Sequence, residues 1–181
     1  QTPIEGSPID LARIAEIGEK GVLLLMADST NAERSGFTMS ERTVGETFDN
    51  VFRGAKGRII VASFASNIHR IQQIINSAIK YGRKVSLVGR SMLNVVQVAE
   101  KLGHLSYPKD TVVDIDRINK LRPEQVVIIT TGSQGEPMSA LTRIAAGAHK
   151  KVEIMEGDLV IISANPIPGN EKFVYRVIDA L

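Results

Sequence analysis

Five short apolar runs in this sequence are each followed at once by residues that could bind an anion or carry acid–base chemistry. The runs are residues 21–27, 58–63, 84–89, 125–131 and 158–164. The segments at their ends, rich in Gly, Ser, Thr and Asn, are Asp28-Ser29-Thr30, Ser63–Asn67, Gly89-Arg90-Ser91, Gly132–Glu136 and Asn165–Asn170. Apolar runs of this length predict strands of a parallel sheet buried on both faces. Ligands bind at the carboxyl ends of such strands, so we expect the chemistry at that edge.

The segment "SFASNIHR" is the sharpest candidate for an anion site. Ser66 is placed to cap a helix whose first-turn N–H groups and positive dipole end favour an anion, and His69 and Arg70 lie in the same turn. "GRSM" repeats this arrangement with Arg90 and Ser91. Two such helix starts at one edge suit a phosphate or a phosphodiester. The alternative is that both serines are ordinary N-caps beside solvated basic residues, and the pattern leaves this open.

Asp28 ends the first apolar run, "GVLLLMA", at a place where a carboxylate often acts in catalysis. The same place is common for an Asx turn or a helix cap, or for a metal ligand. The spacing of the residues does not decide between these roles.

Composition and missing motifs exclude several classes of site. The 181 residues contain no Cys, which removes disulfides, thiolate zinc sites and cysteine nucleophiles. No P-loop, GxGxxG or GxSxG pattern is present. The three histidines, His69, His104 and His149, have no metal-ligand spacing, and we place the last two in loops or at the surface. We therefore predict no metal site in this chain.

The balance of charge and hydropathy predicts a soluble, cytoplasmic protein. A net charge of +2 is too small to indicate non-specific nucleic-acid binding, so an anionic partner needs a local site. No apolar run approaches the roughly 20 residues that span a bilayer. The chain begins with Gln1 and ends at Leu181 inside an amphipathic pattern, so we expect it to be cut from a longer protein.

Helical patterns alternate with the apolar runs. They cover residues 38–52, 66–82, 91–103, 136–147 and the C-terminal residues to 181, with a capping box at Thr38 and Glu41 and Pro137 in a first turn. We expect a weak edge strand at 151–155, mostly loop at 104–123 with a short helix at 116–121, and a loop with one short helix in 1–20. This alternation predicts an α/β fold, with a Rossmann-like parallel sheet and helices on both faces.

Six strings, in order along the chain, resemble the ribonuclease J family of metallo-β-lactamase/β-CASP nucleases. They are "LLLMADSTNAE", "FTMSERTVGETF", "SFASNIHRIQQII", "VGRSM", "TTGSQGEPMSAL" and "NPIPGNE". The resemblance implies that residues 1–35 are the tail of a first metallo-β-lactamase segment and that residues 36–181 are a β-CASP domain. It also implies two zinc ions in the parent protein, whose ligands lie outside this chain.

The resemblance also assigns roles to particular residues. Asp28 falls on the family's first β-CASP motif, an acid that orients a catalytic histidine absent from this chain. Ser66, Asn67 and Ile68 fall on a loop similar to the family's site for the RNA 5′-monophosphate. The full set that we assign to RNA phosphate is Ser63, Ser66, Asn67, Ile68, His69, Arg70, Arg90 and Ser91. No contact is assigned to the loop Gly132–Glu136.

The implied function is part of a zinc-dependent ribonuclease with 5′–3′ exonuclease and endonuclease activity, in mRNA decay and rRNA maturation. We expect this chain to form one wall of the RNA channel and to be inactive alone. Expected partners are RNA, preferably 5′-monophosphorylated, and a second copy or a paralogue. Two other readings stay open: a non-catalytic module that binds RNA or protein, and an enzyme acting on a small phosphorylated metabolite.

Overall fold

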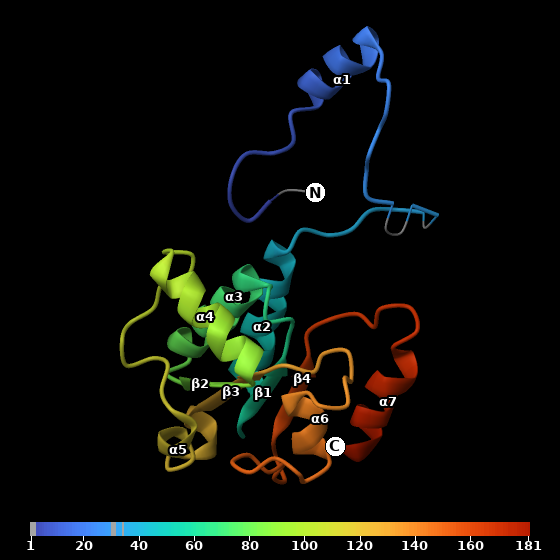
Figure 1. The fold of residues 1–181 in the computed structure, drawn as a ribbon. Helices are drawn as coiled ribbons and strands as arrows, with labels where there is room; N and C mark the ends of the chain where they lie inside the picture. The colour runs from blue at the N-terminus through green and yellow to red at the C-terminus, as the bar shows by residue number, and fades with distance from the viewer. Residues whose placement is uncertain (1–2, 30–31, 34) are drawn as a thin grey trace. The chain divides into compact units, whose positions relative to one another are not determined.

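A computed structural model describes residues 3–29, 32–33 and 35–181. The chain divides into two compact units, Gln1–Thr43 and Val44–Leu181, drawn in Figure 1. The domain boundary expected between residues 35 and 36 stays a prediction. None of the helices in these described ranges is long and apolar enough to cross a membrane.

The first unit contains one helix, α1 (Leu11–Lys20), as expected for residues 1–20. Asp10 caps it by accepting a hydrogen bond from the Arg13 N–H at 2.9 Å. The strand predicted at residues 21–27 is wrong, because these residues are irregular and exposed. A strand needs a neighbour to take up its N–H and C=O groups, and no strand among the described residues pairs with this run.

The second unit is built around a four-stranded sheet with all strands parallel. Its spatial order is β2-β3-β1-β4. Ile59 is in register with Val127 on one side and with Leu159 on the other. The strands are β1 (Ile59–Ala62), β2 (Lys84–Val88), β3 (Val126–Thr130) and β4 (Leu159–Ile162). Four of the five predicted strands are therefore confirmed, to within two residues at each end.

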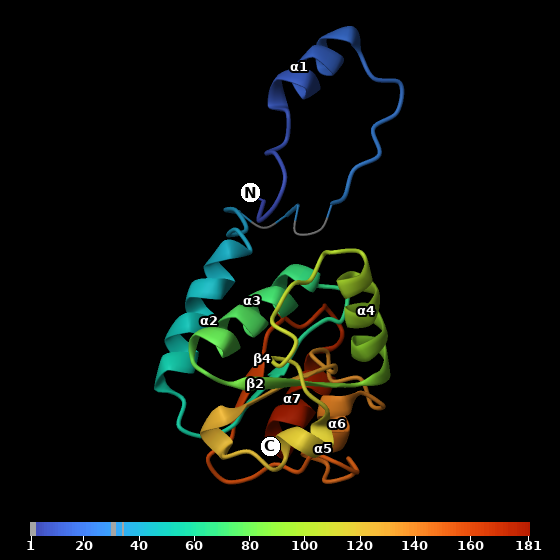
Figure 2. The ribbon, with the colours of Figure 1, turned by 90° about the vertical axis from the view of Figure 1, so that its left-hand side faces the viewer.

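Helices cover both faces of this sheet, so the predicted α/β fold class is confirmed. Figures 1 and 2 show α2, α3 and α4 on one face and α6 and α7 on the other. The helices are α2 (Arg42–Gly54), α3 (Ile68–Lys80), α4 (Arg90–Lys101), α5 (Ile115–Ile118), α6 (Ala140–Ala145) and α7 (Glu171–Ala180), with a 3₁₀ turn η1 (Pro123–Gln125).

Alternation along β1 divides the core into two layers. Ile59 and Val61 pack with apolar side chains of α2, α3 and α4. Ile60 and Ala62 point to the opposite face and pack with α5, α6 and α7. Each of these isoleucines is fully buried and contributes roughly 1.5–3 kcal/mol by leaving water. Packing on both faces of β1 therefore sets the direction of the residues that follow the strand.

Two helix starts differ from the sequence prediction. Helix α2 begins at Arg42, later than the start that the predicted capping box at Thr38 and Glu41 implies. Helix α6 begins at Ala140 with Ser139 as its N-cap, so Pro137 lies before the helix. Ser139 Oγ accepts from the Thr142 N–H at 3.4 Å, and this bond sets the later start.

The predicted loop at residues 104–123 carries one extra pairing. Val112 forms a parallel bridge with Val85 and so covers the outer edge of β2. The predicted short helix at 116–121 is present as α5, displaced toward the N-terminus.

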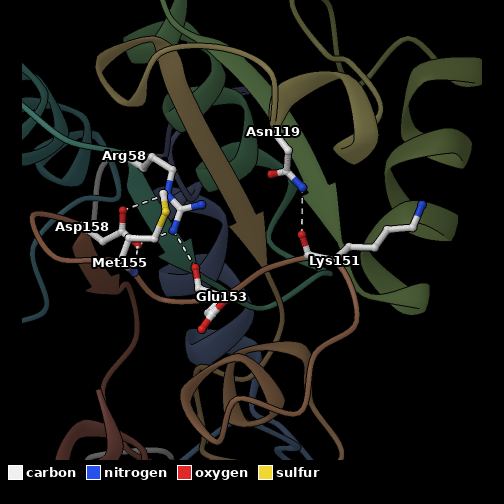
Figure 3. A network of polar contacts seen from close by, with 6 residues as sticks. All are labelled: Arg58, Asn119, Lys151, Glu153, Met155 and Asp158. Carbon is white, nitrogen blue, oxygen red and sulfur yellow. Dashed lines mark hydrogen bonds and ion pairs between the residues drawn. The ribbon is translucent and has the colours of Figure 1, made fainter.

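An ion pair fixes the amino ends of β1 and β4 (Figure 3). Arg58 Nε donates to Asp158 Oδ1 at 2.8 Å, and both side chains are more than nine-tenths buried. Arg58 Nη2 also donates to the Glu153 carbonyl at 2.6 Å, and the Met155 N–H donates to Asp158 Oδ2 at 2.9 Å. The edge strand predicted at 151–155 is wrong: the residues form no ladder, and this arginine takes one of their carbonyls.

Candidate functional site

The parallel strands bring four of the five polar segments to one edge of the sheet. The ladder continues one residue past β1 and β4, because the Ser63 N–H donates to the Thr130 carbonyl at 3.0 Å and the Ser163 N–H to the Ala62 carbonyl at 2.8 Å. The fifth segment, Asp28-Ser29-Thr30, belongs to the other unit, and its Thr30 lies outside the described residues. The carboxyl edge of the sheet, meaning residues 63–70, 89–94, 131–143 and 163–170, is the candidate site.

At this edge, the segments that follow neighbouring strands lead to helices on opposite faces of the sheet. The chain leaves β1 and β2 toward α3 and α4, which pack on one face. It leaves β3 toward α6, which packs on the other. Strand β3 lies between β2 and β1, so its connection diverges from those of both neighbours. Such switch points, where adjacent strands connect to opposite faces, are the usual ligand sites of open α/β sheets.

The first turn of α3 is capped by Asn67, not by Ser66 as predicted. Asn67 Oδ1 accepts from the Arg70 N–H at 3.1 Å. The Ile68 N–H donates to the Ser66 carbonyl, and the Ile71 N–H to the Asn67 carbonyl, each at 3.1 Å. The N–H of His69 has no acceptor among the described residues. It therefore faces outward at the positive end of a 13-residue helix.

Ser63 adds a second unsatisfied donor beside this turn. Ser63 is 1% exposed, and its hydroxyl has no hydrogen-bond partner within the described ranges. It follows Ile59 and Val61 at a spacing of two, so its side chain lies on the face that α3 covers. A buried hydroxyl without a partner is costly, and ligand-binding sites are where such costs are found.

Arg70 is half-buried and joins α3 to the end of β4. Its Nη1 donates to the Ser163 carbonyl at 2.6 Å and to Ser163 Oγ at 3.4 Å. These bonds orient the Arg70 guanidinium at the carboxyl edge. Arg70 was predicted to lie in the site, but its hydrogen bonds to Ser163 were not predicted.

The start of α4 lies at the end of β2. Gly89 is its N-cap residue, with φ of 113° and no side-chain cap, so Ser91 is not the predicted cap. A Cβ at Gly89 would lie 2.8 Å from Thr131 Oγ1, which explains why glycine occupies this position. Arg90 and Ser91 are exposed at the same edge, as is His69.

A cleft of about 800 Å³ opens between the start of α4 and the segment that joins β3 to α6. Arg90, Ser91 and Asn94 line one wall, and Arg143 and His149 line the other. Neither Arg143 nor His149 was predicted as a site residue. His149 was assigned to a loop or the surface, because only the fold brings it near Arg90.

The loop Gly132–Glu136 is a structural junction at this edge. Gln134 is 3% exposed, and its Oε1 accepts from the Ile167 N–H at 2.7 Å while its Nε2 donates to the Asn165 carbonyl at 3.0 Å. Gly135 has φ of 69°, and a Cβ there would lie 2.4 Å from the Phe173 backbone. This loop thus holds the β4–α7 connection in place, a role that no sequence signal gave to Gln134.

Asp28 is exposed in an irregular segment of the first unit, so its predicted place at the end of a buried strand is wrong. The predicted catalytic role of Asp28 stays a prediction.

Metal-ligating side chains do not gather in the part of the chain that the structure describes. No three His, Asp or Glu side chains there lie close enough together to hold a metal ion. These residues therefore do not fit the pair of zinc ions that the family resemblance implies, and we derive no chemical step through a metal.

Comparison with known proteins agrees with this fold. A family model described as "Ribonuclease J, beta-CASP domain" matches residues 56–181. Ribonuclease J of Mycolicibacterium smegmatis is 48% identical over 181 residues, which is 100% of this chain and 32% of that protein. Ribonuclease J of Synechocystis sp. is 51% identical over 99% of this chain and 28% of its own length.

A third relative gives a similar result. Ribonuclease J of Thermus thermophilus is 51% identical over 180 residues, which is 99% of this chain and 31% of that protein. The chain thus spans about a third of the length of the curated relatives it matches. On the strength of the family model and these identities, the chain belongs to the ribonuclease J family, and residues 56–181 form its β-CASP domain.

Proposed function

We propose that this chain is the phosphate-reading part of a longer ribonuclease and that the first turn of α3 binds the 5′-monophosphate of RNA. The observation that carries the proposal is the pair of unsatisfied donors at this turn, the buried Ser63 hydroxyl and the His69 N–H. A phosphate supplies acceptor oxygens for both donors and is favoured by the helix dipole.

The other assigned residues complete the phosphate site. Ser66 and His69 are exposed beside the turn, and Arg70 is held there by Ser163. Arg90 and Ser91 stand at the neighbouring helix start and would contact the strand beyond its terminal phosphate. Phosphate contacts of this kind set the register of a nucleic acid without reading its sequence.

The hydrolytic chemistry belongs to the whole protein in this proposal. The two zinc ions that the resemblance implies would be held by ligands outside this chain and would supply the metal chemistry of hydrolysis. Asp28 would orient a histidine that this chain lacks, so the isolated chain is expected to bind RNA weakly and not to cleave it. Exonuclease and endonuclease activity, a cytoplasmic location and assembly with a second copy or a paralogue belong to the same proposal.

The test uses the full-length protein with Ser66→Ala and Arg70→Gln combined. We expect the preference for 5′-monophosphorylated over 5′-hydroxyl RNA to fall about tenfold or more, because charge-assisted bonds to the terminal phosphate are lost. Arg122→Gln is the control, since it removes a guanidinium at an exposed position before β3, at the amino end of the sheet. An unchanged preference would show that the turn is only a capped helix start.

The role of Asp28 has its own test. Asp28→Asn in the full-length protein should lower the cleavage rate by about 10–100-fold, the usual loss for a residue that orients a catalytic group. Affinity for the uncleaved RNA should stay the same, because the RNA-phosphate residues are untouched. Equal loss of affinity and rate would contradict an orienting role.

A further inference from the structure

The cleft of about 800 Å³ between α4 and the β3–α6 segment has the size of a ligand site and the position of one. It opens at the carboxyl ends of β2 and β3, whose helices α4 and α6 pack on opposite faces of the sheet. A second switch point therefore lies beside the one at the end of β1. Adjacent strands are about 4.8 Å apart, so a short stretch of RNA can reach from one to the other.

The charged side chains of this cleft favour an anion. Arg90 on one wall is exposed and has no partner among the described residues. Arg143 on the other wall donates from Nη2 to the Ala148 carbonyl at 3.3 Å, a long bond that leaves most of its donors available. The one carboxylate in the lining is Glu136, whose Oε2 accepts from the Gln134 N–H at 3.2 Å. Two guanidinium groups against one carboxylate leave a net charge of +1 with His149 neutral.

His149 contributes a hydrogen-bond donor of fixed direction. Its Nδ1 accepts from the Val152 N–H at 3.1 Å and from the Lys151 N–H at 3.3 Å. The neutral ring therefore carries its proton on Nε2, which is not part of this turn. Burial, followed by the nearby Arg143 charge, lowers the pKa of His149, which favours the neutral donor.

We propose that this cleft binds an internal phosphate of the RNA strand, as a subsite separate from the 5′-phosphate site at α3. Arg90 and Arg143 donate to the phosphate from opposite walls, and His149 supplies a third donor through Nε2. This inference rests on the proposed function, because it places the same RNA strand along the carboxyl edge of the sheet. It assigns Arg143 and His149 to strand binding without any role at the 5′ end.

The test measures binding of short single-stranded RNA to the full-length protein in buffer without divalent metal, with RNA integrity checked on a gel. Arg143→Gln should weaken binding of 5′-monophosphorylated and 5′-hydroxyl RNA by the same factor, about tenfold. The slope of log affinity against log salt should fall by about 0.7, the value for one lost phosphate contact with a single strand.

Three further variants separate the subsite from a loss of folding. Arg143→Lys keeps the charge and should retain the salt slope. His149→Asn keeps an acceptor near the position of Nδ1 for the turn but removes the Nε2 donor, so it should weaken binding without changing the slope. Arg122→Gln, at an exposed arginine that precedes η1 near the amino end of β3, is the matched control and should change neither quantity.

The outcomes also separate this inference from the proposed function. Unchanged affinity and slope in Arg143→Gln, with the protein folded, would overturn the subsite. Weakening confined to 5′-monophosphorylated RNA would overturn it too, because Arg143 would then belong to the terminal phosphate site. If instead the unmodified protein shows no preference for a 5′-monophosphate, the proposed function fails at α3, while the salt slope of Arg143→Gln still reports on the cleft.

Discussion

At the amino ends of the strands, buried arginines bind other groups of the protein, whereas at the carboxyl ends several donors have no partner. Arg58 binds Asp158 and the Glu153 carbonyl, as Figure 3 shows. Arg83, just before β2, donates to the Gly57 carbonyl at 2.8 Å and also to the Ala55 carbonyl, while its Nε has no acceptor among the described residues. These side chains tie together the segments that enter the sheet.

The carboxyl edge also contains polar and basic residues, but several of their hydrogen-bond donors have no acceptor among the described residues. The Ser63 hydroxyl, the His69 N–H and the Arg90 guanidinium have no acceptor among the residues that the structure describes. A protein tolerates unsatisfied donors where a ligand completes them. The side chains at the amino ends therefore supply stability, and the donors at the carboxyl edge are placed to bind a ligand.

The largest expected effect is at the amino edge. Asp158→Ala should lower the free energy of unfolding by about 3–5 kcal/mol, because it leaves the buried Arg58 charge without its partner. Asp116→Ala is the matched control, since it removes an exposed ion pair with Lys151 and should cost less than about 1 kcal/mol. Chemical denaturation measures both; equal losses would contradict a stabilising role for the amino edge.

A smaller loss is expected where the carboxyl edge is tightly packed. Gly135→Ala should cost at least about 2 kcal/mol, because a Cβ there meets the Phe173 backbone in addition to the strain of a positive φ. Gly147→Ala has a similar φ, 65°, but open space around the Cβ, and should cost only about 1 kcal/mol. Thermal unfolding distinguishes them, and equal costs would show that the Phe173 contact does not matter.

Ser63→Ala should separate stability from binding. Removing an unsatisfied buried hydroxyl should leave the free energy of unfolding unchanged or raise it by up to about 1 kcal/mol. Ser139→Ala, which removes a satisfied helix cap, should instead lower it by about 1 kcal/mol. Affinity for 5′-monophosphorylated RNA should fall with Ser63→Ala. A clear loss of stability with Ser63→Ala would place Ser63 with the stabilising residues.

The smallest effect concerns pH. Burial lowers the pKa of His149 below its usual 6.5, so the unfolded chain binds more protons than the folded one as pH falls below that value. Stability from this group is therefore present above pH 6.5 and is lost on acidification, by less than about 1 kcal/mol after solvent screening. His149→Asn should show a smaller fall in stability between about pH 7 and pH 5.5; an identical fall would remove His149 from this effect.

The sequence predicted the sheet of the second unit because its strands carry their own signal. The runs around Ile59, Val85, Val127 and Val160 are apolar on both faces, and the helices between them fit right-handed crossovers. The run at residues 21–27 carries the same signal but forms no strand. Apolar composition reports what a segment can bury, whereas a strand also needs a partner, which a local pattern does not show.

The sequence predicted only those parts of the candidate site that are formed by residues close together in the chain. Ser66 and Asn67 are neighbours that both favour the N-cap position, so the pattern found the turn but not the residue that caps it. Arg143 and His149 lie more than 50 residues from Arg90 in the chain and meet it only through the order of the strands. The Ser63 hydroxyl has no hydrogen-bond partner among the described residues, and this became visible only in the structure.

Titration of the ¹⁵N-labelled chain with a short 5′-monophosphorylated RNA tests the central comparison most directly. The amide signal of His69 is expected to move most, since that N–H is the unsatisfied donor at the α3 turn, while the amide of Leu159 at the amino edge stays in place. A 5′-hydroxyl RNA of the same sequence should move the His69 signal much less. Equal shifts with both RNAs, or shifts centred on the amino edge, would contradict the assignment of phosphate binding to the carboxyl edge.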